Sequence, residues 1–203
     1  MHPKLDQYIK RALRQLDGVS PPRGDLLEKV ADFVSEERSL GRIAALNFIC
    51  THNSRRSQMG QLWAIAAAAH FGLDGVRVFS GGTEVTAFNP RAVAAIARAG
   101  FSLWSPGGHN PHYRATIEED GPGFECFSKK YDDPFNQAQG FAAIMTCSEA
   151  DEACPVVLGA TLRIPLRYED PKVADGTPDE AAVYDERCMQ IATEMLYVFS
   201  RVR

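Results

Sequence analysis

The sequence of 203 residues lacks an apolar run long enough to cross a bilayer, and it has no excess of basic residues. Its formal net charge is -4, from 22 Lys and Arg against 26 Asp and Glu. A broad nucleic-acid-binding surface needs clustered Lys and Arg, so this composition argues against one. The first residues also lack the charged and then apolar layout of a signal peptide. We therefore expect a cytoplasmic protein that binds neither nucleic acid nor a membrane.

The five cysteines fit neither a disulfide framework nor a zinc knuckle. Their number is odd and the chain shows no export signal, and both facts argue against a structural disulfide framework. Cys147 and Cys154 are too far apart for a short C-x2-4-C pair, and no second pair accompanies them, so structural zinc is the disfavoured alternative. Free thiols or redox partners remain as roles for Cys50, Cys126, Cys147, Cys154 and Cys188.

Hydrophobic periodicity predicts one α/β domain with two additions. Apolar residues at helical spacing predict an N-terminal helical extension over residues 1–40, which we expect to serve packing or a homodimer. Residues 41–203 form the predicted main domain, with an irregular insertion at about 104–140 that is rich in Gly, Pro, His and Asp. Short apolar runs alternate with helical patterns, which predicts a parallel sheet. The predicted strands are 43–49, 76–80, 141–146 and 161–166; the predicted helices begin near 57, 90 and 179.

A Cys-x5-Arg-Ser segment runs from Cys50 to Ser57, after an apolar strand and at the start of a helix. Successive loop amides and the helix dipole favour negative charge there, so a thiolate is stabilised at Cys50. Arg56 can fork two hydrogen bonds to a tetrahedral oxyanion, and the Ser57 hydroxyl can donate to the sulfur. We predict that Cys50 attacks an oxyanion held by Arg56 and by the loop between them. The loop residues predicted to bind substrate are Thr51, His52, Asn53, Ser54 and Arg55, with Asn53 bracing the backbone.

This segment resembles the active-site loop of low-molecular-weight protein tyrosine phosphatases and of thioredoxin-coupled arsenate reductases. The resemblance covers about residues 42–103 and 141–202 and implies a three-layer α/β fold with a central four-stranded parallel sheet. The chain departs from the family at His52, where glycine is usual, and at Arg55, where many members have cysteine. Residues 50–59, 80–84, 89–93 and 100–101 carry the resemblance.

The resemblance also implies roles for two cysteines and one aspartate downstream. In the reductases the nucleophile forms a covalent arsenate adduct, a second cysteine releases arsenite, and a third resolves the disulfide. Carried over, these are Cys50, Cys147 and Cys154, with thioredoxin as the external reductant. Cys147 and Cys154 lie in residues 146–155, a segment that resembles the reductase motif as a whole. The alternative is two buried cysteines that flank the start of a helix. Asp170, before Pro171, takes the place of the general acid, and Asp133 is a competing candidate.

Three functions therefore stay open at this stage. The first is reduction of arsenate, and the second is hydrolysis of phosphomonoesters through a phosphocysteine at Cys50, with Asp170 as acid and then base. The third is a regulatory anion-binding module in which His52 and Arg55 have abolished catalysis. Some reductases bind potassium beside the loop through an acidic residue, but the matching position is Gln61. We therefore expect no metal and no bound cofactor, with arsenate or phosphate as the small oxyanion.

Overall fold

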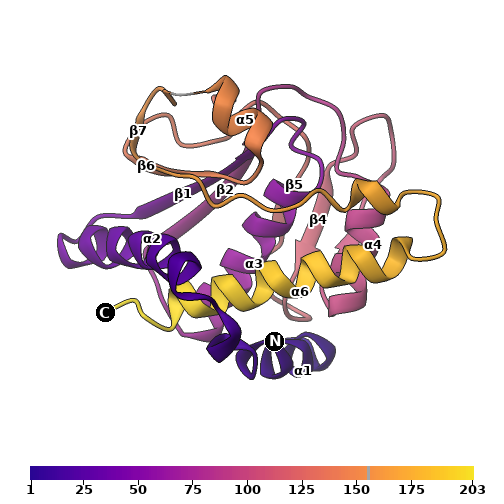
Figure 1. The fold of residues 1–203 in the computed structure, drawn as a ribbon, viewed down its shortest axis with the longest axis horizontal. Coiled ribbons are helices and arrows are strands. Elements are labelled where there is room, and N and C mark those ends of the chain that lie inside the picture. The colour runs from indigo at the N-terminus through magenta and orange to yellow at the C-terminus, as the bar shows by residue number, and fades with distance from the viewer. Residues whose placement is uncertain (155) are drawn as a thin grey trace.

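A four-stranded parallel sheet forms the centre of the molecule (Figure 1). The computed structural model describes residues 1–154 and 156–203, and it describes Ala153 only as part of a helix. Every residue of the central strand β1 is buried, as expected for a strand covered on both faces. The predicted α/β class and parallel sheet are confirmed. In the order β2-β1-β6-β7, the strands are Val76–Gly82, Ala44–Cys50, Phe141–Met145 and Ala160–Ile164.

The two faces of the sheet are covered differently (Figure 1). Leu46 and Phe48 of β1 belong to the large core cluster that includes side chains of the long helices, whereas Ile49 faces a smaller cluster with Met145 and Ala150. The side chains of β1 alternate in this way because successive residues of a strand point to opposite faces. None of the described helices combines the length and apolar character needed to span a bilayer. The helices are α2 (Pro21–Ser39), α3 (Arg56–His70), α4 (Pro90–Ala99) and α6 (Glu180–Phe199), with short α5 (Ser148–Ala153) on the second face.

The N-terminal residues pack against the rest of the chain. After α1 (Pro3–Leu13) come a short 3-10 helix, η1 (Leu16–Gly18), and α2. Leu5 is fully buried in the same cluster as Trp63, and Tyr8 stacks on the Trp63 ring at a centroid distance of 5.1 Å. The apolar face of α1 is therefore used within the chain's own core.

A small antiparallel sheet begins just before the predicted irregular insertion and continues into it. Its strands, in the order β3-β4-β5, are Ser102–Trp104, Tyr113–Thr116 and Phe124–Cys126. The sequence did not reveal these strands, because strands of three or four residues are too short to show an alternating period. Beyond β5 the chain lies along the end of β2, where the Gly82 amide donates to the Lys129 carbonyl at 2.9 Å. The insertion thus reaches the edge of the sheet at which β1 ends.

Candidate active site

The loop between β1 and α3 forms a small pocket at the carboxyl edge of the sheet. Cys50 ends β1 and is buried, and Arg56 begins α3. Between them Asn53 has a φ of 46°, the one positive φ outside glycine in the described part of the chain. Asparagine tolerates this left-handed conformation better than most residues, which explains its place in the bend. The pocket is lined by Cys50, Thr51, His52, Ser54, Arg55, Arg56 and Asp170.

The Cys50 thiol is hydrogen-bonded to Ser57, and Asn53 orients that contact. The Ser57 Oγ lies 3.1 Å from the Cys50 Sγ, and the Asn53 Nδ2 donates to the same Oγ at 2.8 Å. The Asn53 Oδ1 accepts from the Lys129 amide at 3.0 Å, which fixes the side-chain amide in this orientation. Because the Ser57 oxygen already accepts a hydrogen bond, its own hydrogen can point to the sulfur. The arrangement suits a thiolate that needs a donor.

Arg56 is held by the segment that carries Asp170. Its Nη1 donates to the Tyr168 carbonyl and its Nη2 to the Asp170 Oδ2, both at 2.8 Å. A guanidinium has further N–H donors, so the others stay available to an oxyanion in the pocket. Asp170 caps a 3-10 helix, η2 (Pro171–Ala174), through the Lys172 amide. The competing candidate Asp133 is not among the residues that line this pocket, and its carboxylate accepts from the Phe135 amide.

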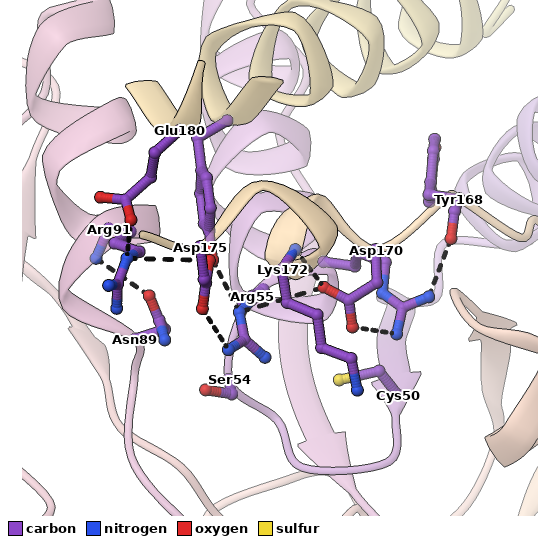
Figure 2. Close-up of polar contacts among 12 residues, drawn as sticks. Cys50, Ser54, Arg55, Asn89, Arg91, Tyr168, Asp170, Lys172, Asp175 and Glu180 are labelled. Carbon is purple, nitrogen blue, oxygen red and sulfur yellow. Dashed lines mark hydrogen bonds and ion pairs between the residues drawn. The ribbon is translucent and has the colours of Figure 1, made fainter. Parts of the chain in front are cut away.

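Arg55 joins the loop to η2 and α6, and sequence reasoning missed its partners. Arg55 lies between Asp170 and Asp175 (Figure 2). Its Nε is 3.9 Å from the Asp170 Oδ1, and its Nη2 is 3.6 Å from the Asp175 Oδ2. The Arg55 Nε also donates to the Tyr184 hydroxyl at 2.9 Å, and that hydroxyl donates to Asp175 at 2.8 Å. Burial raises the pKa of Tyr184 to about 12, and its hydrogen bond to Asp175 acts in the same direction. Tyr184 is therefore a neutral donor near pH 7, and no motif marked it or Asp175.

His52 does not need the backbone freedom of the usual glycine. Its φ is not positive, and its half-exposed ring places Nε2 3.2 Å from the Glu84 carboxylate. The His52 carbonyl accepts from the Ser128 hydroxyl at 2.8 Å, and the Ser128 Oγ accepts from the Thr86 amide at 2.9 Å. The insertion thus supports the loop from outside the pocket through Ser128 and Lys129.

Cys147 lies beside the loop, at the start of α5. Its Sγ is 3.5 Å from the Thr51 Oγ1 and accepts from the Ala150 amide at 3.4 Å. Burial raises the pKa of Cys147, and the hydrogen bond with Thr51 opposes this rise. Cys50 and Cys147 belong to one apolar cluster, and half-buried Cys154 packs against it. The residues between Cys147 and Cys154 form helix α5, whereas Pro155, which ends the motif, lies outside the described residues.

The other two cysteines lie apart from this cluster. Cys188 is fully buried in the main core and accepts from the Trp63 indole at 3.2 Å, as predicted for a core residue. Cys126 is fully buried in β5. All five cysteines are free thiols. At the position matched to the family's potassium ligand, the Gln61 Oε1 accepts from the Ser80 hydroxyl at 2.6 Å.

Comparison with known proteins identifies the same family that the loop from Cys50 to Ser57 indicates. No family model matches the chain. The arsenate reductase of Bacillus licheniformis is 30% identical over 140 residues, which cover 69% of this chain and 83% of that protein. The arsenate reductase of Bacillus subtilis is 28% identical over 140 residues, with the same two coverages.

Solved structures share the fold at lower sequence identity. A low-molecular-weight phosphotyrosine phosphatase from Vibrio cholerae O395 has a TM-score of 0.51 at 12% identity and covers 77% of this chain and 95% of its own. A mutant of YwlE from Bacillus subtilis has a TM-score of 0.52 at 13% identity, with 77% and 97% covered.

A four-stranded parallel sheet with a Cys-x5-Arg loop at its carboxyl edge defines the class of proteins with the low-molecular-weight phosphatase fold. Within that class, the arsenate reductase of Bacillus licheniformis is similar enough in sequence, and over enough of this chain, to identify the family. The chain belongs to the family of arsenate reductases and low-molecular-weight protein tyrosine phosphatases.

Proposed function

We propose that this protein reduces arsenate to arsenite through Cys50, Cys147 and Cys154, with thioredoxin as the external reductant. The main support is the position of Cys147: its sulfur lies 3.5 Å from Thr51, the residue that follows Cys50. The relatives named arsenate reductase add a second, independent line of support. A thiol relay requires a second and a third thiol near Cys50, and Cys147 and Cys154 supply them in the same apolar cluster.

The first two steps use the pocket and the Cys50–Cys147 pair. The Cys50 thiolate attacks arsenic, and one oxygen leaves as water after it takes a proton from Asp170. Arg56 and the loop amides hold the remaining oxygens and stabilise their charge. The Cys147 thiolate then attacks the Cys50 sulfur, so that the electron pair of the sulfur–arsenic bond stays on arsenic. Arsenic leaves as arsenite, and a Cys50–Cys147 disulfide remains.

Cys154 completes the relay. Its thiolate attacks the Cys147 sulfur, the Cys147–Cys154 bond forms, and the Cys50 thiolate leaves with the electron pair of the broken bond. A dithiol of the thioredoxin class then reduces the Cys147–Cys154 disulfide. Support comes from the half-buried position of Cys154, which leaves it more accessible than Cys50 and Cys147.

Hydrolysis of phosphomonoesters is the second candidate function. The specific observation that favours it is Asp170, which lines the Cys50 pocket and lies 2.8 Å from Arg56. In this alternative, Asp170 protonates the leaving oxygen and then activates the water that cleaves the phosphocysteine. Cys147 and Cys154 would have no part in turnover.

The decisive experiment compares the two activities in wild type and in Cys147→Ser. We expect arsenate-dependent oxidation of NADPH, coupled through thioredoxin and thioredoxin reductase, to fall to background in Cys147→Ser and in Cys154→Ser. Cys126→Ala, which removes a buried thiol outside the cluster, is the matched control and should keep its turnover. Hydrolysis of p-nitrophenyl phosphate that survives both serine variants, in a protein without arsenate turnover, would assign the phosphatase function instead.

A homodimer through the N-terminal helices stays a prediction. Leu5, Ile9 and Ala12 of α1 and Leu27 and Val30 of α2 are already buried within the chain. A dimer would therefore have to use the outer faces of these helices, and sedimentation or light scattering of the purified protein tests it.

A further inference from the structure

Helix α5 separates the two thiols that the proposed relay must join. Cys147 is its N-cap and Cys154 its C-cap, with six helical residues between them. The rise per residue of an α-helix therefore places their Cα atoms about 10 Å apart along the axis. A disulfide requires Cα atoms within about 7 Å of each other. The end of α5 must therefore unwind before a Cys147–Cys154 bond can form.

One arginine of the neighbouring strand β7 holds that end in place. The Arg163 Nε donates to the Cys154 carbonyl at 3.1 Å, and its Nη2 donates to the Asp151 carbonyl. The last carbonyls of a helix have no partner within the helix, so an arginine that binds two of them acts as a cap. Unwinding the end of α5 separates both carbonyls from Arg163.

A buried carboxylate strengthens this contact. The side chain of Asp151, in α5, is 4% exposed, and it forms ion pairs with Arg163 and with Arg167. The Arg167 Nε donates to the Asp151 Oδ2 at 2.7 Å, whereas the Asp151 Oδ1 is close to Arg163 without the alignment of a hydrogen bond. Arg167 would keep this carboxylate paired if Arg163 were replaced. Among the described residues, Arg163 alone binds both the carboxylate and the two helix carbonyls.

We propose that Arg163 is a positioning residue that keeps α5 folded and so sets the rate at which Cys154 reaches Cys147. This inference rests on the relay of the proposed function. The step it controls is attack of the Cys154 thiolate on the Cys147 sulfur, which forms the Cys147–Cys154 bond and releases the group previously bonded to Cys147. Arg163 touches neither thiol, and it acts through the stability of the helix between them.

The test measures closure of the pair without arsenate. In a Cys50→Ser background, dithiobis-nitrobenzoate serves as the oxidant: one protein thiolate attacks the reagent and releases thionitrobenzoate. The second protein thiolate then attacks the protein-bound sulfur and releases another thionitrobenzoate, and peptide mapping identifies the Cys147–Cys154 disulfide. We expect closure to be about tenfold faster in Arg163→Met, since hydrogen bonds from a charged donor are lost. Arg163→Lys, which keeps the charge but not the fork to two carbonyls, should give an intermediate rate.

Hydrogen exchange separates this local effect from general destabilisation. The Asp151 amide donates to the carbonyl of the N-cap Cys147, and the Cys154 amide donates to the Ala150 carbonyl. Both amides should exchange faster in Arg163→Met, while the amides of α6 do not change. The matched control is Arg77→Met, because exposed Arg77 of β2 has no side-chain hydrogen bond or ion pair with the described residues. If Arg163→Met unfolds as a whole, Arg163→Lys provides the same comparison.

Two results would overturn the inference: one would overturn the role of Arg163 alone, and the other would also overturn the proposed relay. Equal closure rates in wild type, Arg163→Met and Arg163→Lys would show that Arg163 does not hold α5, and the relay would stand. If no Cys147–Cys154 disulfide formed in any of the proteins, the relay and the role of Arg163 would both be wrong.

Discussion

At the scale of single residues, Thr51 lies between Cys50 and Cys147, the two thiols of the first half of the proposed relay. It follows Cys50 in the loop, and its hydroxyl is the side-chain partner of the Cys147 sulfur. Burial raises the pKa of Cys147, and the Thr51 hydrogen bond opposes that rise. Below this pKa the thiolate fraction, and with it the rate of arsenite release, should rise about tenfold for each pH unit.

Thr51→Val should slow arsenite release at pH 7 by about threefold to tenfold, because loss of the hydrogen bond raises the pKa of Cys147 further. The difference from wild type should shrink as the pH rises, since both proteins approach full ionisation of Cys147. Single-turnover release of arsenite, measured by rapid quench from pH 6.5 to 9.5, checks this. Thr161→Val, on β7, is the matched control. A deficit that stays constant at every pH would show instead that Thr51 acts on arsenate binding.

At the scale of elements, the contact between α4 and α1 depends on Gly100. This residue ends α4 with a φ of 112°, and a Cβ built on it would lie 2.3 Å from the Leu5 amide nitrogen of α1. Gly100→Ala should lower the free energy of unfolding by about 2 to 4 kcal/mol, from backbone strain plus displacement of α1. Urea denaturation of the purified variant measures this.

Gly41→Ala is the control that separates backbone strain from the displacement of α1. Gly41 also has a positive φ, 68°, but a Cβ there would have nothing within 4 Å. It should therefore lower the free energy of unfolding by about 1 kcal/mol through backbone strain alone. Equal losses in the two variants would mean that α1 moves away without penalty and contributes little to the fold.

The sequence predicted best the long or buried elements, whose hydrophobic pattern is visible within the element itself. Apolar runs predicted the strands of the central sheet, and the loop from Cys50 to Ser57 carried its own signature. The short strands β3 to β5 were missed, because their pairing depends on contacts between segments and not on local periodicity. The same reason hid Tyr184 and Arg163: each meets its partner only after distant segments pack together. Asp170 was predicted because its dipeptide matched a family position, although nothing local distinguished it from Asp133.

At the scale of the whole molecule, the free energy of unfolding should depend on pH through buried thiols and one buried amine. As the pH rises, deprotonation of the amine should raise the stability and deprotonation of the thiols should lower it. Burial raises the pKa of Cys126 to about 12 and that of Cys188 to about 11, and it also raises the pKa of Cys147. Burial lowers the pKa of Lys129 to about 8; its ammonium lies 4.5 Å from the Phe127 ring centroid. Each group changes the free energy of unfolding by about 1.4 kcal/mol per pH unit while it is ionised differently in the folded and unfolded chains.

The two effects should give maximal stability near pH 9. Between about pH 8 and 9 the unfolded chain keeps the Lys129 proton that the folded chain releases, so stability rises with pH. Above about pH 9 the unfolded chain loses thiol protons that the folded chain keeps, and three thiols outweigh one amine, so stability falls. Lys129→Met should remove the rise and be more stable than wild type at pH 7 by about 2 kcal/mol, since it replaces a buried charge with an apolar chain of similar length. Urea denaturation from pH 7 to 10 measures both curves, and a rise that persisted in Lys129→Met would place its origin in another group.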